Sequence, residues 1–290
     1  MNIYEQLKNE LGIRLEQVEA TVKLIDEGNT IPFIARYRKE VTGSLNDEVL
    51  RNLHERLVYL RNLEEKKEQV LGSIEEQGKL TDELKAQILA ATTLVEVEDL
   101  YRPYRPKRRT RATIAKEKGL EPLAELIFTQ TLDKPAEEAG AAYVKEAEDA
   151  ALSVKSAKEA VEGALDIIAE QISDDADYRR YIREITMEEG KIVSSAKEAK
   201  TESVYEMYYE FEEPLSKLPG HRILALNRGE DEKILTVKVS APEERILQFL
   251  RTKLIVKKNA FTDELLAFAA EDAYNRLIAP AIEREIRNDL

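Results

Sequence analysis

Apolar residues recur three or four positions apart along most of the chain, the spacing that places them on one face of an α-helix. One such helix covers about residues 15–25 and stops at Gly28, and a short one follows at Pro32. A long helix is predicted from Ser44 to Gly78, with leucines on one face and then a stretch, EEKKEQ, that is polar on all sides. We expect part of this long helix to bridge solvent between packed units.

Strand patterns are rare by comparison. Only residues 191–197 and 233–240 alternate in the way expected of strands, with β-branched side chains. The predicted fold class is therefore mainly α: an elongated multi-helix scaffold with helix-turn-helix-like pairs and a small β element. Further helices are predicted at residues 82–91, 94–100, 174–189, 221–232, 242–256 and 263–288, with two more within 133–173.

The chain is predicted to contain two regions. Residues 1–130 form an N-terminal helical region with two helix-turn-helix-like pairs, around Gly28 and around Gly119. Residues 131–290 form a helical region with the small β element. Such helix pairs also occur in proteins that bind no DNA, and residues 121–130, EPLAELIFTQ, offer acids where a recognition helix needs donors.

Positive charge is concentrated in one short segment. The chain carries a net charge of −13, yet residues 101–119 hold eight bases and one acid. Within it lies YRPYRPKRRTRAT, residues 101–113, which we call the basic strap. An acidic surface repels polyanions, so any nucleic-acid contact must be local.

The two prolines of the strap, Pro103 and Pro106, disfavour a regular helix and favour an extended polyproline path with three residues per turn. On that path the arginines at 102, 105, 108 and 111 share one edge, and the two tyrosines share another. Guanidinium groups suit phosphate oxygens, and the tyrosines could stack on bases or lie against the protein body. The candidate nucleic-acid-binding residues are Tyr101, Arg102, Tyr104, Arg105, Lys107, Arg108, Arg109 and Arg111.

A structural interpretation of the strap stands beside this one. With 57 acids in the chain, a positive segment can lie across carboxylate-rich helices and hold them together. The two interpretations are not exclusive. A secondary basic patch is formed by Arg36, Arg38 and Lys39, for which ordinary solvation at the surface is the alternative.

Candidate catalytic chemistry is scarce. The chain has no cysteine and only two histidines, His54 and His221, both in helical surroundings, and no glycine-rich phosphate loop. The aromatic group Tyr205, Tyr208, Tyr209 and Phe211 is interpreted as core packing rather than a binding platform. We therefore predict a protein that is not an enzyme and uses no metal or cofactor. No apolar run is long enough to span a bilayer and the N-terminus is not a signal peptide, so cytoplasmic residence is expected.

Three segments carry a family resemblance: residues 30–57, TIPFIARYRKEVTGSLNDEVLRNLHERL; residues 98–124, EDLYRPYRPKRRTRATIAKEKGLEPLA; and residues 227–239, NRGEDEKILTVKV. They resemble the bacterial Tex family of transcription accessory proteins, which is related to eukaryotic transcription elongation factors. The resemblance implies a helical N-terminal portion, followed in complete members by an RNase H-like domain, helix-hairpin-helix modules and a C-terminal OB-fold that binds RNA. None of those later domains is expected in these 290 residues, which resemble an N-terminal fragment.

The predicted function is a non-enzymatic, transcription-associated scaffold module that contacts nucleic acid weakly and without sequence preference through the basic strap. The alternative is a purely structural or protein-interaction region that docks the transcription machinery, with nucleic-acid binding confined to the later domains. The expected partners are therefore nucleic acid and proteins of the transcription machinery, with no membrane.

Overall fold

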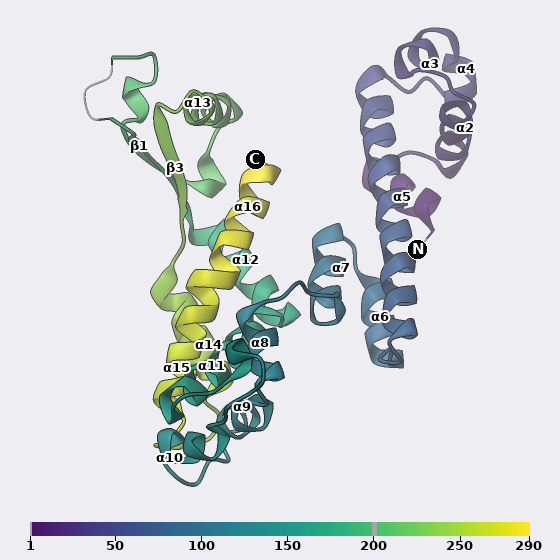
Figure 1. Cartoon of the computed structure of the whole chain (residues 1–290). Helices are drawn as coiled ribbons and strands as arrows, with labels where there is room; N and C mark the ends of the chain where they lie inside the picture. The colour runs from purple at the N-terminus through teal and green to yellow at the C-terminus, as the bar shows by residue number, and fades with distance from the viewer. Residues whose placement is uncertain (1, 199–201) are drawn as a thin grey trace. The chain divides into compact units, whose positions relative to one another are not determined.

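The computed structural model describes residues 2–198 and 202–290, which are mostly helical with one small antiparallel sheet (Figure 1). The prediction of a mainly α fold with a small β element is confirmed. The chain divides into two compact units, Met1–Tyr104 and Arg105–Leu290, called unit 1 and unit 2. From the sequence, the boundary between two regions is predicted after residue 130. That boundary divides the sequence and not the compact units, and it stays a prediction.

Unit 1 is built around its longest helix, α5, against which α1, α2, α3, α6 and α7 all pack. Thr30 caps α3 through the Phe33 N–H, and Thr81 caps α6 through the Leu84 N–H. The helices are α1 (Ile3–Leu11), α2 (Leu15–Asp26), α3 (Ile31–Tyr37), α4 (Lys39–Thr42), α5 (Asp47–Glu76), α6 (Asp82–Ala90) and α7 (Leu94–Tyr101).

The start and the middle of α5 differ from the sequence prediction. The helix begins at Asp47, because the side chain of Asn46 accepts the Val49 N–H at 2.9 Å, whereas Ser44 has a φ of 66°. Lys67, within the polar stretch, is buried, and its Nζ donates to the Leu89 carbonyl at 2.8 Å. The predicted solvent bridge is therefore wrong. The buried face is continuous through Leu50, Leu53, Leu57, Leu60, Leu63, Lys67, Val70 and Ile74.

The core of unit 2 surrounds α11, which is contacted by α8, α9, α10 and α15. Gly163 on α11 permits this packing, since a Cβ at that position would lie 2.3 Å from Leu120 Cδ1. The helices are α8 (Arg111–Glu117), α9 (Glu121–Phe128), α10 (Ala136–Gly140), α11 (Ala157–Ser173), α12 (Ala176–Glu189), α13 (Gly220–Asp231), α14 (Glu243–Leu254), α15 (Asp263–Asp272) and α16 (Ala279–Asp289).

The sheet of unit 2 has the strand order β2-β1-β3, with both neighbouring pairs antiparallel. The strands are β1 (Lys191–Ala196), β2 (Glu210–Pro214) and β3 (Leu235–Ser240). The sequence predicts β1 and β3 but not β2, whose residues EFEEP have little strand propensity. Tyr205 and Tyr208 are buried in the core of unit 2, which confirms the core-packing interpretation for these two side chains.

The chain from Asp263 onward continues through α15, a π-helical segment (Ala273–Ile278) and α16, in line with the single predicted helix. In α16, Glu283 accepts the Val239 N–H at 3.0 Å and Arg287 donates to the Val237 carbonyl at 3.3 Å. Both backbone groups belong to β3. These side chains therefore satisfy polar groups at the edge of the sheet, where an unpaired strand is prone to aggregation.

Candidate nucleic-acid interface

The basic strap does not follow the predicted polyproline path. Its first residue, Tyr101, ends α7, and Arg102–Tyr104 form a 3-10 turn that accommodates Pro103. Residues 105–110 have no regular structure, and Arg111 begins α8. A single edge formed by every third residue requires a continuous extended path, so the predicted edge of four arginines is wrong.

The two tyrosines of the strap lie against the core of unit 1. The Tyr101 hydroxyl is hydrogen-bonded to Ser73 Oγ at 2.9 Å, and Lys66 Nζ lies 5.8 Å from the centre of its ring. The Tyr104 carbonyl accepts from Gln77 Nε2 at 2.8 Å, and both rings are half-buried. Of the two alternatives for these side chains, packing against the protein body is the one that the structure contains.

Arg102 is the remaining strap base in unit 1. It follows α7 directly, and its backbone N–H donates to the Glu98 carbonyl. The residue is half-buried, and its buried Nε makes no hydrogen bond with any residue that the structure describes. Arg102 is therefore less open to solvent than the strap bases that follow it.

Lys107 is tied to unit 2. Its Nζ lies 2.8 Å from Glu170 Oε1 and also pairs with Asp174, and both carboxylates are largely buried. Thr110, which caps α8 through the Thr113 N–H, also approaches Glu170, with Oγ1 3.4 Å from Oε2. Lys107 therefore neutralises two carboxylates at the C-terminal end of α11, as the structural interpretation of the strap expects. Nothing in the sequence pattern singles out Glu170 or Asp174 among so many acids.

The other strap bases of unit 2 face solvent. Arg105, Arg108, Arg109 and Arg111 are all exposed. Arg109 has an exposed partner, with Nη2 3.5 Å from Glu117 Oε2, while Arg108 makes no ion pair with any residue in the described ranges. Arg108 thus has an exposed positive charge without a carboxylate partner among the described residues.

Arg111 also acts on a neighbouring carboxyl group. Partial burial raises the pKa of Asp166, and the positive charges of Arg276 and Arg111 oppose that rise. Arg276 Nη2 lies 3.9 Å from Asp166 Oδ1, and Arg276 opposes the rise in pKa more strongly than Arg111 does. The exposed guanidinium of Arg111 therefore keeps the capacity to meet an external anion.

The secondary basic patch lies where α3 meets α4. The Arg38 guanidinium lies 4.9 Å from the centre of the Phe33 ring, and its Nη1 donates to the Tyr37 carbonyl at 2.9 Å. Arg36 and Lys39 are exposed. None of the three bases pairs with a carboxylate in the part of the chain that the structure describes, so the patch keeps its positive charge.

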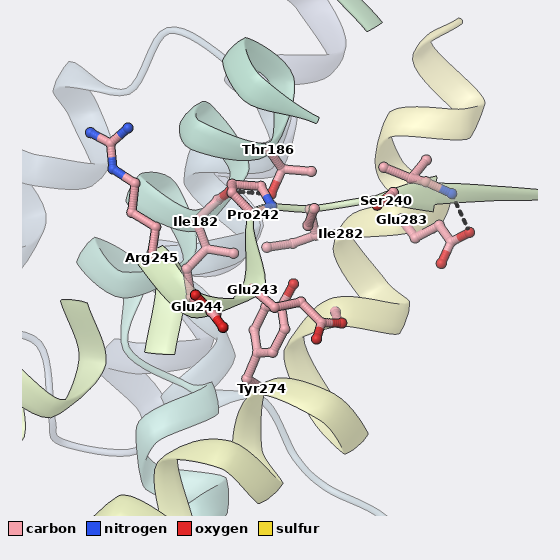
Figure 2. A pocket seen from close by; sticks show the side chains of 13 residues that line it. Ile182, Thr186, Ser240, Pro242, Glu243, Glu244, Arg245, Tyr274, Ile282 and Glu283 are labelled. Carbon is pink, nitrogen blue, oxygen red and sulfur yellow. Dashed lines mark hydrogen bonds between the residues drawn. The ribbon is translucent and has the colours of Figure 1, made fainter. Parts of the chain in front are cut away.

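One cavity of unit 2 is acidic (Figure 2). It has a volume of about 800 Å³ and lies between α12, α16 and the segment that leads from β3 into α14. Burial and the charges of Glu243 and Glu283 raise the pKa of Tyr274 to about 12. Figure 2 shows Glu243 beside that ring and Arg245 extending away from it. A cavity with three carboxylates would repel phosphate, so it does not extend the basic surface.

No catalytic or metal-binding cluster accompanies these surfaces in the described residues. His54 and His221 are exposed on α5 and α13 respectively. Residues 2–198 and 202–290 contain no group of three or more His, Cys, Asp or Glu side chains arranged to hold a metal ion. No helix among them is both long and apolar enough to cross a membrane.

Comparison with known proteins identifies the family. Residues 1–75 match the Tex-like protein N-terminal domain, and residues 131–290 match the Tex central region. The chain is 47% identical over 99% of its length to the uncharacterized protein YdcI of Bacillus subtilis. It is 45% identical over 82% of its length to the transcriptional accessory protein Tex of Neisseria gonorrhoeae. It is 28% identical over 93% of its length to the human S1 RNA-binding domain-containing protein 1.

These matches define a family of transcription accessory proteins, and the chain belongs to the Tex family. The chain spans 40% of the Bacillus relative, 31% of the Neisseria relative and 28% of the human relative. Activities of those whole proteins can therefore reside in parts that these 290 residues do not cover.

Proposed function

We propose that the chain is a non-enzymatic, transcription-associated module that contacts nucleic acid weakly and without sequence preference. The contact is made by Arg105, Arg108, Arg109 and Arg111, on a helical scaffold that also offers surface to proteins of the transcription machinery. The supporting observation is that Arg108 is exposed and has no ion pair in the described residues, within a segment of eight bases and one acid. Cytoplasmic residence is part of this proposal, because such a module needs access to nucleic acid undergoing transcription.

The names of the relatives support this proposal. One is a transcriptional accessory protein, and another contains an S1 RNA-binding domain. Binding by the chain itself should be weak, since its net charge of −13 repels a polyanion. Phosphate contact through isolated arginines carries no sequence information, so all sequences should be bound about equally.

A second candidate function, bracing of acidic helices, is supported by the contacts of Lys107 with Glu170 and Asp174. In this proposal the strap has two roles. Lys107 holds the segment against α11, and Arg108, which is exposed and makes no ion pair in the described residues, meets an external partner. The two roles can therefore be tested on different residues.

The experiment compares Arg108→Ala/Arg109→Ala with Lys107→Ala in binding titrations against duplex DNA at several salt concentrations. The arginine variant should weaken binding and lower the slope of log K against log salt by up to about 0.9 for each lost phosphate contact. Arg108→Lys/Arg109→Lys, which keeps both charges, is the matched control and should keep most of the slope. An unchanged slope in Arg108→Ala/Arg109→Ala would remove the strap from the interface and leave only its structural role.

A further inference from the structure

A second basic segment of unit 2 runs from α14 into the loop before α15. Residues 245–262 contain five bases and no acid. One of these bases, Arg245, pairs with Glu189. The other four are exposed and make no ion pair with any residue described by the structure; they are Arg251, Lys253, Lys257 and Lys258. We call residues 251–261, which comprise the last turn of α14 and the loop after it, the basic loop.

The backbone of the basic loop is held by a buried amide. Gln130, which follows α9, is 7% exposed and has a φ of 56°. Its side chain donates to the Leu254 carbonyl and accepts from the Lys257 N–H, both at 2.9 Å. One side chain thus fixes the backbone on both sides of residues 255 and 256, just before Lys257 and Lys258.

A second amide fixes the other side of the loop. Asn259 Nδ2 donates to the carbonyls of Gln130 and Leu132, each at 3.0 Å, and its Oδ1 accepts the Phe261 N–H at 2.8 Å. The Asn259 N–H in turn donates to Asp263 Oδ1 at 3.2 Å, at the start of α15. Lys257 and Lys258 are therefore displayed on an ordered loop, which lowers the entropy cost of binding a ligand there.

The loop also exposes apolar side chains beside its charges. Val256 is 73% exposed and Phe261 is 40% exposed. An aromatic ring among basic side chains that lack ion pairs is the combination used to bind single-stranded nucleic acid. A nucleobase stacks on the ring while the cationic side chains contact the phosphates. Aspartate and glutamate side chains would satisfy the four charges but have no flat ring to place on Phe261.

From this arrangement we propose that the basic loop binds a single strand of nucleic acid. Arg251, Lys253, Lys257 and Lys258 contact phosphates, and Phe261 stacks on a base. The site uses none of the strap residues, so it is a contact surface separate from the one in the proposed function. Gln130 and Asn259 are positioning residues, because they hold the loop and touch no ligand.

The test uses the whole chain with fluorescently labelled 20-residue oligo-U and oligo-dT, at several salt concentrations. Lys257→Ala/Lys258→Ala should weaken binding at least about fivefold at low salt and lower the salt slope by about 1.4, or about 0.7 for each contact on a single strand. Lys217→Ala/Lys238→Ala removes the same charge from exposed positions elsewhere in unit 2 and is the matched control. It should change the slope by much less.

Phe261→Ala separates stacking from charge. It should weaken oligonucleotide binding about fivefold or more, and it should leave binding of inorganic polyphosphate, which has no bases, unchanged. If Lys257→Ala/Lys258→Ala behaves like its control, the basic loop is not a nucleic-acid site, whatever the strap variants do. If the lysine variant loses polyglutamate binding while oligonucleotide binding is unaffected, the loop serves an acidic protein partner and the inference is overturned. Absence of oligonucleotide binding by the parent chain would overturn this inference together with the proposed function.

Discussion

Lys107 Nζ lies 2.8 Å from Glu170 Oε1, at the end of α11 where the helix dipole is negative. Asp174, the next residue after Ser173, pairs with the same ammonium group. One lysine therefore compensates two largely buried carboxylates and a helix C-terminus. The contact gives the strap a structural role that its composition alone does not distinguish from ligand binding.

Replacing Lys107 by Ala should destabilise unit 2 by about 1–3 kcal/mol. This range lies between the small free energy that an exposed ion pair contributes to stability and the larger free-energy cost of leaving a buried charge without its partner. Urea denaturation followed by circular dichroism measures the change. Adding Glu170→Gln and Asp174→Asn to the variant should restore part of the loss, since the uncompensated charges are then gone. A variant as stable as the parent would show that the contact contributes nothing.

Replacing Lys67 should loosen α6 from α5. Lys67→Ala leaves the Leu89 carbonyl without its donor and opens space in the core, at a cost of about 2–4 kcal/mol. Lys67→Met keeps most of the volume and loses only the polar contacts, so it should cost about half as much. Thermal unfolding gives both values, and faster hydrogen exchange confined to α6 and the facing part of α5 would locate the effect. A Lys67→Met variant as stable as the parent would argue against a role for the hydrogen bond.

Unit 1 should lose stability in acid. Hydrogen bonds from Arg56 lower the pKa of Glu10, and those from Arg61 lower the pKa of Asp26. Because the folded pKa lies below the unfolded one, each pair stabilises the fold above the unfolded pKa, and this contribution disappears as the pH falls through the folded value. Hydrogen-exchange protection factors in α1, α2 and α5 should therefore fall below pH 4.5, the ordinary value for a glutamate. Arg56→Gln/Arg61→Gln should show a flatter pH dependence, and an identical profile in parent and variant would contradict the assignment.

Gln130 should control the order of the basic loop. Gln130→Ala removes the bonds to Leu254 and Lys257, so amide exchange in residues 254–261 should become faster while the rest of α14 is little changed. Gln130→Gly serves as the comparison, because it removes the same side chain but relieves the positive φ. Gly should therefore be less destabilising than Ala in thermal unfolding. Unchanged exchange in both variants would mean that the loop is ordered by other contacts.

Metal-dependent nuclease activity is not expected. The acidic cavity is lined by Tyr274 together with its carboxylates, and the described residues contain no group of three or more His, Cys, Asp or Glu side chains arranged to hold a metal ion. Incubation of the chain with labelled DNA or RNA and Mg²⁺ or Mn²⁺ should give no cleavage above the level in buffer. Cleavage that disappears on replacing one particular carboxylate would show that the chain is an enzyme.

Much of the fold could be predicted from the sequence, because helix signals are local. The cap at Thr81, the proline that opens α3 and the glycine after α2 each act within a few residues, and each marks a helix end in the structure. β2 escaped prediction because its strand conformation comes from pairing with β1 and not from its own side chains.

The candidate site could be predicted only in part. The excess of bases in residues 101–119 is a property of composition, and the exposed Arg108 and Arg109 follow from it. The polyproline path failed because α7 extends to Tyr101 and α8 begins at Arg111, which leaves too few residues for a continuous extended edge.

The sequence by itself determined the helical class, several helix ends and the position of the positive charge, since each depends on neighbours within one or two turns. Only the tertiary structure decided what each charged side chain does. Lys67 is buried because α6 covers it, and Lys107 is paired because the end of α11 lies beside it. Gln130 orders a loop more than a hundred positions further along the chain. The physical reason is that burial and ion pairing depend on groups brought together by folding, and their distance apart in the sequence carries no signal of that contact.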